Sequence, residues 1–318
     1  MTVEVGGAGT LGLAFETVLG TYTVPTKWVP IRSESLKLVE GKVWGRNIKG
    51  KADITRATKG YFHVEGDIVF EVSGASLLYF LYAARMTIAK VGAMAPWHYT
   101  FTGAHVAKST TAASGPTVRR TLSMLVTRSG NPMGYTGLSV SQLTFTIDSG
   151  VLICTASMIG SGEAAQSAGT PTYVAEDPFG PGEITLEVPT ATARADADTF
   201  TLTINDNGQA ANRLNGLRTA AYITWGEREV TASMETDFDS LTDFNDFVAQ
   251  TSRTFKVKAI NTAVTDEVDI LLNAAINEDT TVNLTSLGDV VRQSISYHGI
   301  YDTTDACTID VYTAESVV

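Results

Sequence analysis

Three glycines near the N-terminus, Gly7, Gly9 and Gly12, have the G-x-G-x-x-G spacing that lets a backbone turn approach a pyrophosphate in dinucleotide-binding proteins. Such a turn needs a strand before it, a helix of several turns after it, and an acidic residue at the end of a second strand. Here the helix that would follow, residues 13–20, ends at Gly20, and Pro25 comes soon after. We therefore expect residues 1–19 to be a flexible leader rather than a nucleotide site.

The remaining residues that could do chemistry do not form a recognisable constellation. The histidines lack the spacing of a zinc site, and the sequence contains neither a G-x-S-x-G nucleophile elbow nor a P-loop. Cys154 and Cys307 lie in apolar, strand-like surroundings, which favours inert core thiols and fits a reducing cytosol. Glu71 and Glu235 fall in different parts of the chain, where capping or salt bridges are commoner than acid–base catalysis. We predict no enzyme activity and no catalytic residue, metal site or cofactor. The four histidines are His63, His98, His105 and His298.

One segment stands out for its charge. Residues 36–60 combine seven cations with only two carboxylates and one tryptophan, and strand-like segments flank them. The segment is either a solvated loop or a projecting hairpin that contacts an acidic neighbour, in which an exposed tryptophan among cations would serve as an anchor. We call it the basic arm. Its candidate inter-subunit contact residues are Lys42, Trp44, Arg46, Lys49, Lys51 and Arg56.

Most of the chain has the composition of β-strands. Segments such as 144–148, 150–157, 199–204 and 254–260 are rich in β-branched and aromatic residues and are bounded by turn residues. Two stretches instead carry apolar residues at helical spacing, 73–84 and 239–249, with Ser76 and Ser240 as candidate helix starts. We expect each helix to bury its stripe in a domain core. The candidate core residues are Leu77, Phe80, Leu81, Leu241, Phe244 and Phe247.

The two helical stretches resemble copies of each other. IVFEVSGASLLYF (68–80) aligns without a gap with ASMETDFDSLTDF (232–244), so that Glu71 matches Glu235 and Phe80 matches Phe244. Downstream, 122–128 resembles 269–275, 140–148 resembles 290–298, and the cysteine segment 150–157 resembles 305–312. The shared order predicts an internal duplication.

A Gly-, Pro- and Ala-rich stretch, 160–183, separates the copies. We predict a mainly β protein with domains at 20–170 and 182–318, each with one short helix. The net charge of −11 is unevenly divided: residues 1–168 carry 15 Lys and Arg against 10 Asp and Glu, and residues 169–318 carry 8 against 24. The two halves could therefore face different partners, including each other's copies. The net acidity disfavours a DNA-reading protein, and no apolar run is long enough to span a membrane.

Residues 15–38, FETVLGTYTVPTKWVPIRSESLKL, resemble the N-terminal signature of tailed-bacteriophage tail tube (major tail) proteins. That signature runs roughly E-x-x-x-G-T-x-x-x-P-T-[KR]-aromatic-[LV]-P-x-x-S-E-S-L. Leu19 departs from it, since an aromatic residue is expected there. The matching residues are Glu16, Gly20, Thr21, Pro25, Thr26, Lys27, Trp28, Val29, Pro30, Ser33, Glu34, Ser35 and Leu36.

This resemblance implies domains that are β-sandwiches or incomplete barrels flanked by one helix. It implies that six such domains form a ring and that stacked rings form a tube for DNA passage. Two domains per chain would then give three chains per ring, or six if the second domain decorates the outside. The implied partners are other copies of the chain, the tape measure protein and DNA in the lumen, and tail terminator and tail-tip proteins. The implied location is the virion tail, after synthesis in the host bacterial cytoplasm.

An alternative is a carbohydrate-binding or adhesin-like two-domain β protein, in which Trp28, Trp97 and Trp225 would be exposed aromatic platforms. An enzyme is a third possibility, but the sequence offers no residues for its chemistry.

Overall fold

Alternation of buried and exposed side chains, the period of a β-strand, runs through most of the chain. The structure is a computed structural model. It describes residues 9–45, 56–92, 94–103, 121–174, 177–214, 216–220, 222–263, 265–283, 290–301 and 305–316. Within these ranges it contains twenty strands and two helices, and the strand pairings are antiparallel apart from isolated bridges. The mainly β class with two short helices is therefore confirmed.

The first half of the fold comprises eleven strands and one helix. It begins with four short to medium strands and then a long one, which leads directly into the helix. The elements are β1 (Thr10–Phe15), β2 (Lys27–Val29), β3 (Ser33–Glu34), β4 (Lys37–Gly45), β5 (Arg56–Glu71), α1 (Gly74–Ala83), β6 (Thr87–Val91), β7 (Trp97–Thr102), β8 (Leu122–Arg128), β9 (Asn131–Asp148), β10 (Val151–Gly160) and β11 (Gly162–Ala165).

The second half has nine strands and one helix. Its elements are β12 (Ile184–Glu187), β13 (Ala197–Asn205), β14 (Gln209–Ala211), β15 (Tyr222–Thr224), β16 (Glu229–Asp237), α2 (Thr242–Ala249), β17 (Ser252–Asn261), β18 (Asp266–Asn283), β19 (Arg292–Gly299) and β20 (Cys307–Thr313).

Strand order is the same in the two halves. The first half pairs its strands in the order β4-β5-β10-β9-β8-β1, and the second half in the order β13-β16-β19-β18-β17-β12. In each half a hairpin leads into the helix, and the last strand of a meander returns to pair with the hairpin. The longest strand of each half also pairs with one further strand: β9 pairs with β11 in the first half, and β18 pairs with β20 in the second half. Among the residues that the structure describes, the second half has no counterpart of the hairpin β6–β7.

β-bulges fix which residues occupy equivalent positions. Ser141 is the extra residue of β9 against β10, and Glu278 is the extra residue of β18 against β19. Because a bulge is a local landmark in a strand, these two residues correspond, and they set the alignment of β9 with β18. A second bulge gives the same alignment, since it makes Tyr135 equivalent to Leu272.

The same landmarks correct the sequence alignment. Asp67 faces Ser157 as Ser233 faces Ser296, so Asp67 of β5 is equivalent to Ser233 of β16. The sequence alignment, extended by one residue, instead pairs Asp67 with Thr231, and it is therefore wrong by two positions in this strand.

Further along, β8, β9 and β10 correspond to β17, β18 and β19, one strand away from the matches made in the sequence. Cys154 in β10 and Cys307 in β20 are therefore not equivalent. Similar β-branched strands follow one another along the chain, so a slip by one strand costs little in sequence similarity.

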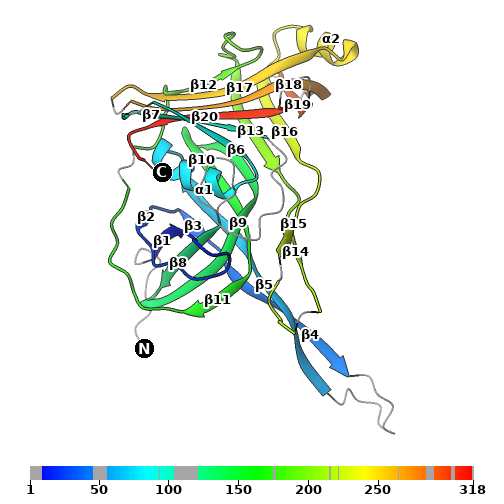
Figure 1. Cartoon of the computed structure of the whole chain (residues 1–318). Helices are drawn as coiled ribbons and strands as arrows, with labels where there is room; N and C mark the ends of the chain where they lie inside the picture. The colour runs from blue at the N-terminus through cyan, green and yellow to red at the C-terminus, as the bar shows by residue number, and fades with distance from the viewer. Residues whose placement is uncertain are drawn as a thin grey trace.

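Backbone pairing joins the halves into one body with a continuous hydrophobic core. The outer edge of β9 pairs with β13 through residues 142–146 and 201–205, and β7 pairs with β20. Figure 1 shows α1 enclosed by strands of both halves, with β20 and β7 above it, whereas α2 lies at the outer edge of the second half. The hairpin β4–β5 projects from the body at the opposite end.

The two helices differ in burial. All ten residues of α1 are buried, and Ser73 caps the helix in a capping box with Ser76, which is therefore its third residue rather than its start. In α2 the predicted stripe is wrong as a core: Leu241 is 60% exposed and Phe244 43%, and Phe247 is only half-buried. The helix meets β18 with its other side, through Asp243.

The N-terminal leader is also corrected over the residues that the structure describes. Thr10–Phe15 form β1, which is buried and pairs with β2 and β8. Because β1 pairs with β8 as β12 pairs with β17, β1 is the first strand of the repeated topology. A sequence reading missed it because the glycines and alanines around it dilute the strand signal.

Candidate assembly interfaces

A buried carboxylate holds the turn that follows β1. Glu16 is 3% exposed and accepts four hydrogen bonds, from Gly20 N at 2.8 Å, Gly137 N at 2.7 Å, Thr121 Oγ1 at 2.7 Å and Ser123 Oγ at 2.9 Å. Burial raises the pKa of the Glu16 carboxyl, although the four donors act against that rise. Gly20 has φ of +75°, a conformation that suits glycine. Glu16 and Gly20 of the sequence signature thus form one turn, which we call the signature turn.

Two further signature residues pack this corner of the fold. A Cβ on Gly12 would lie 2.8 Å from Cβ of Pro25 and 2.9 Å from the Trp28 ring, so Gly12 makes room for a tryptophan that is only 5% exposed. Trp28 N donates to Thr172 O, and Val174 N donates to Trp28 O, which ties the connection between the halves to β2. Gly12 therefore serves packing.

Glu34 completes the signature. Its carboxylate pairs with Arg128 at 2.5 and 2.6 Å, and it also accepts the Leu36 N–H at 3.1 Å. Arg128 Nη2 donates in addition to Leu36 O at 2.6 Å. The backbone polar groups of Leu36 are thus bonded to side chains, and β4 begins at the next residue.

The basic arm is a β-hairpin whose described part comprises β4 and the start of β5. Trp44 is 49% exposed, and Lys42 and Arg56 are exposed as well. Lys42 lies directly opposite Lys59, an arrangement of like charges that destabilises an isolated hairpin. An acidic neighbour would remove that repulsion. Arg46, Lys49 and Lys51 lie outside the described residues.

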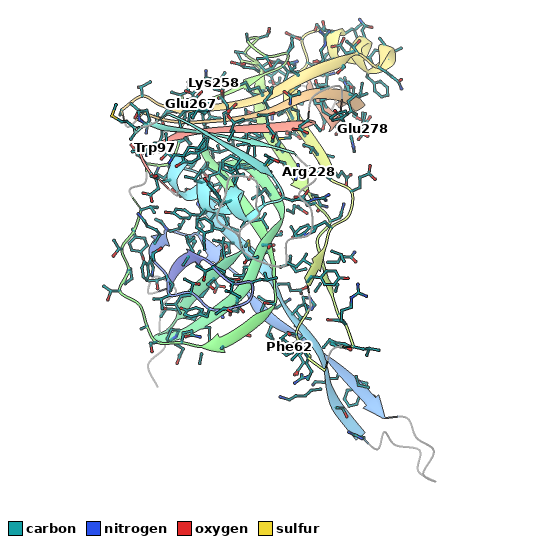
Figure 2. The ribbon with its side chains drawn as sticks, in the orientation of Figure 1. Phe62, Trp97, Arg228, Lys258, Glu267 and Glu278 are labelled. Carbon is teal, nitrogen blue, oxygen red and sulfur yellow. The ribbon has the colours of Figure 1, made fainter. Side chains whose placement is uncertain are left out.

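Residues of the second half hold the base of this arm. Phe62 N donates to Arg218 O and Ala220 N donates to Phe62 O, and Arg218 also forms an ion pair with Glu40. Figure 2 shows Phe62 at this junction, where β5 leaves the body. The arm is therefore anchored at its base, while the described part beyond it projects.

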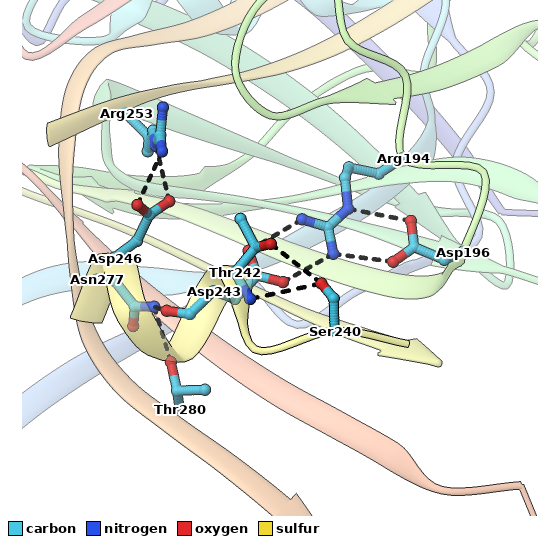
Figure 3. Close-up of polar contacts among 9 residues, drawn as sticks. All are labelled: Arg194, Asp196, Ser240, Thr242, Asp243, Asp246, Arg253, Asn277 and Thr280. Carbon is cyan, nitrogen blue, oxygen red and sulfur yellow. Dashed lines mark hydrogen bonds and ion pairs between the residues drawn. The ribbon is translucent and has the colours of Figure 1, made fainter. Parts of the chain in front are cut away.

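α2 is held in place by a network of charged and polar residues (Figure 3). Arg194 bridges Asp196 at 2.8 Å and Asp243 at 3.0 Å, and Asp246 pairs with Arg253 at 2.7 Å. The Asn277 amide donates to Asp243 O at 3.2 Å. The helix is thus fixed on β18 with an apolar face turned outward, formed by Leu241, Phe244 and Val248, the last 65% exposed. We call these three residues the α2 face.

The edge of β18 beside this helix is open among the described residues. On one side, β17 ends its pairing at Ile276, and the strand continues to Asn283 with β19 on the other side alone. Asn277 bonds Thr280 Oγ1 at 2.7 Å across the bulge, which fixes the start of this open stretch. Figure 2 places Glu278, the bulged residue, at the rim of the second half.

The other residues with chemical potential have structural surroundings. His98 bonds Asp310 at 2.8 Å, and His63 and His298 each lie 3.4 Å from a glutamate. His105 lies outside the described residues. Burial raises the pKa of the Cys154 thiol and brings that of Cys307 to about 12. In the described part of the chain, three or more His, Cys, Asp or Glu side chains nowhere gather as metal ligands.

The three tryptophans of the carbohydrate-binding alternative do not form an exposed platform. Trp28 is buried, Trp97 lies under Lys90 Nζ at 3.8 Å from its ring centroid, and Trp225 packs against Gly208. A sequence reading identified the basic arm and the signature turn, but it missed Arg194 and the open edge of β18. An ion pair between Arg194 and Asp243, which lie far apart in the sequence, leaves no local signal, and an edge depends on which strands pair.

Comparison with known proteins adds to this geometry. No helix among the described residues has the length and apolar character needed to cross a membrane. A comparison with curated proteins finds no match. The family model described as "Phage tail tube protein" matches residues 6–299, which include the first half, the second half through β19, both helices and the open edge of β18. The chain therefore belongs to the phage tail tube protein family.

Proposed function

We propose that the chain is a non-catalytic tail tube subunit in which each half is one tube domain, formed by duplication, and that three chains make a ring of six domains. The matching strand order of the two halves is the observation that carries this proposal. A repeating domain needs a head-to-tail contact that closes a ring and a second contact that stacks rings. The chain would supply the first contact once internally, between β9 and β13.

Stacked rings would enclose a channel for DNA and the tape measure protein, and the ends of the tube would meet terminator and tail-tip proteins. The excess of acidic residues in the second half suits such a channel, because a cationic wall would bind phosphates. The basic arm would reach an acidic surface of an adjacent ring. These roles would place the chain in the virion tail after its synthesis in the host cytoplasm.

Electron microscopy and native mass spectrometry of the purified chain at high concentration test the proposal. We expect rings or tubes, and a ring mass of three times the 33.9 kDa of one chain. A ring of six chains would mean that the second half decorates the outside instead. A chain that stays monomeric under all conditions, together with virions whose tails lack it, would refute the proposed function.

A further inference from the structure

We infer that the contact between copies repeats the contact within the chain: the open edge of β18 receives β4 of the next copy, in the register that joins β9 to β13. This inference deepens the proposed ring and rests on it. The pairing that it assigns places Asp279 opposite Val39, Thr280 opposite Leu38 and Thr281 opposite Lys37 of the next copy. The partner is thus a second copy of this chain, seated by strand addition.

The internal junction supplies the register. Gln142, Leu143 and Thr144 of β9 face Asn205, Ile204 and Thr203 of β13. Since the bulges make Ser141 equivalent to Glu278, the three β9 residues that follow correspond to Asp279, Thr280 and Thr281 of β18.

The β13 residues correspond to positions in β4 through their hairpin partners. Thr203 faces Thr231 of β16, Thr231 is equivalent to Glu65 of β5, and Glu65 faces Lys37. The same steps lead from Ile204 to Leu38 and from Asn205 to Val39. Since Leu36 is already bonded to Glu34 and Arg128, the ladder begins at Lys37.

Both edges are open in the single chain. Among the described residues, β4 pairs with β5 alone, and β18 beyond Ile276 pairs with β19 alone. Open edges with unpaired N–H and C=O groups are templates for another strand. In β9 and β13, which hold the equivalent positions, these groups are paired.

Burial at equivalent positions points the same way. Phe145 and Ile204, at the internal junction, are 0% and 4% exposed, whereas their counterparts Val282 and Leu38 are 40% and 39% exposed. Two apolar side chains are therefore uncovered where a second copy would bury them.

The helices show the same difference. α1 is covered by the second half: Gly74 packs against the backbone of Tyr312, and Tyr79 donates to Glu315 at 2.8 Å. The counterpart of this cover for α2 would be the first half of the next copy. Because nothing in the described chain covers the α2 face, the same docking step that pairs β4 with β18 would bury it.

Charge favours this partner. In a ring of such chains every seam joins a first half to a second half, and these halves carry opposite net charges. At the proposed ladder, Lys37 would be the diagonal neighbour of Asp279, within reach of its long side chain, and both residues are exposed in the single chain. Two second halves would instead bring acidic surfaces together.

A cysteine pair tests the register. Side chains directly opposite in an antiparallel pair have Cβ atoms about 4.5–5.5 Å apart, against about 7–8 Å for a neighbour two positions away. Tubes assembled from Lys37→Cys/Thr281→Cys should form disulfides between copies under mild oxidation and give dimers and closed trimers on a non-reducing denaturing gel. The offset pair Lys37→Cys/Asp279→Cys is the matched control, and the in-register pair should exceed it by at least about tenfold. The native thiols of Cys154 and Cys307 are buried and contribute no background.

Cross-linking in the offset pair instead, or in neither pair within normal tubes, would overturn the inference while the tube function stood. Failure of the unmodified chain to assemble would refute the function itself.

A second variant tests burial of the α2 face. Val248→Asp should abolish ring formation but leave the melting temperature of the monomer unchanged, because Val248 contributes little to the core. Val91→Asp is its control, because Val91 is 57% exposed in β6 and belongs to neither β4, β18 nor the α2 face, and this variant should assemble normally. Normal rings from Val248→Asp would refute burial of the α2 face.

Discussion

Replacing Glu16 with alanine should destabilise the fold severely, although the residue belongs to no active site. The substitution removes the acceptor of four hydrogen bonds. Two donors, Thr121 and Ser123, are hydroxyls that can rotate, but the N–H groups of Gly20 and Gly137 are fixed by the backbone. Gly137 is buried, and its N–H left without a partner costs about 1–3 kcal/mol, whereas Gly20 is exposed, so its N–H can bond water and the loss of its bond costs about 0.5–1.5 kcal/mol. The two together should lower the free energy of unfolding by about 1.5–4.5 kcal/mol.

Glutamine at the same position gives a graded comparison. The amide keeps one oxygen, which can accept from one of the two backbone N–H groups, while its NH₂ group meets the other. Glu16→Gln should therefore cost about half as much, about 1–2 kcal/mol. The control is Glu71→Ala: Glu71 pairs with Arg32 at the surface, at 3.0 Å with both side chains more than a third exposed, so its loss should cost at most about 1 kcal/mol.

Equilibrium denaturation of the monomer, followed by the fluorescence of the chain's tryptophans, measures all three variants. The denaturation midpoint should fall in the order Glu71→Ala, Glu16→Gln, Glu16→Ala. If Glu16→Ala were as stable as Glu71→Ala, the four contacts would not anchor the signature turn, and the reasoning that ties the sequence signature to stability would be refuted.

Four further outcomes are expected. First, the pKa of Glu16 in the folded chain lies above its ordinary value of 4.5. The stability that Glu16 contributes should therefore be complete below pH 4.5 and should fall as the pH rises through the raised pKa. The free energy of unfolding of Glu16→Gln should lack this fall with pH, and identical pH profiles of the two proteins would contradict the shift. Second, Glu in place of Lys42, Arg46, Lys49 and Lys51 should block tube growth in sedimentation assays while the protein stays soluble and folded; unchanged growth would exclude the basic arm as a stacking contact. Third, Arg194→Ala should leave Asp196 and Asp243 without their cation and so lower the free energy of unfolding by about 2 kcal/mol or more. The same variant should form rings more slowly in a light-scattering assay. Its control, Lys42→Ala, should not lower the free energy of unfolding. Fourth, Cys154 and Cys307 should resist a thiol reagent in the native state and react only on unfolding; rapid native labelling would contradict their burial.

Both helices and many of the strands, though not β1, could be predicted from sequence, because alternation and helical spacing are local patterns. The signature also located the turn at Glu16 and the beginning of the arm. Strand pairing could not be predicted, and it decides which apolar faces are covered and which residues of the two halves are equivalent. The α2 stripe looked like a core because Leu241 and Phe244 recur at helical spacing, but periodicity reports an apolar face without reporting what covers it. In α1 the second half of the same chain covers that face.

The alignment error has the same origin. An alignment of identical residue types near the helices makes Asp67 equivalent to Thr231. The strand ladders and the bulges at Ser141 and Glu278 instead make Asp67 equivalent to Ser233. A bulge is defined by hydrogen bonds between strands, which a single sequence does not record. The candidate interface is therefore defined by the strand ladders of the two halves and not by residue similarity between them.

The ladder between β9 and β13 has a consequence for how such a chain could be shortened. Cutting it in the connection near residue 172 would strip β9 of a neighbour and uncover α1, so neither fragment would be a self-sufficient product. Each fragment would expose an unpaired strand edge and apolar surface as soon as it was synthesised, and it would bind the other fragment there. Mixing the two separately made fragments should then reconstitute the parent by complementation, as a split protein does.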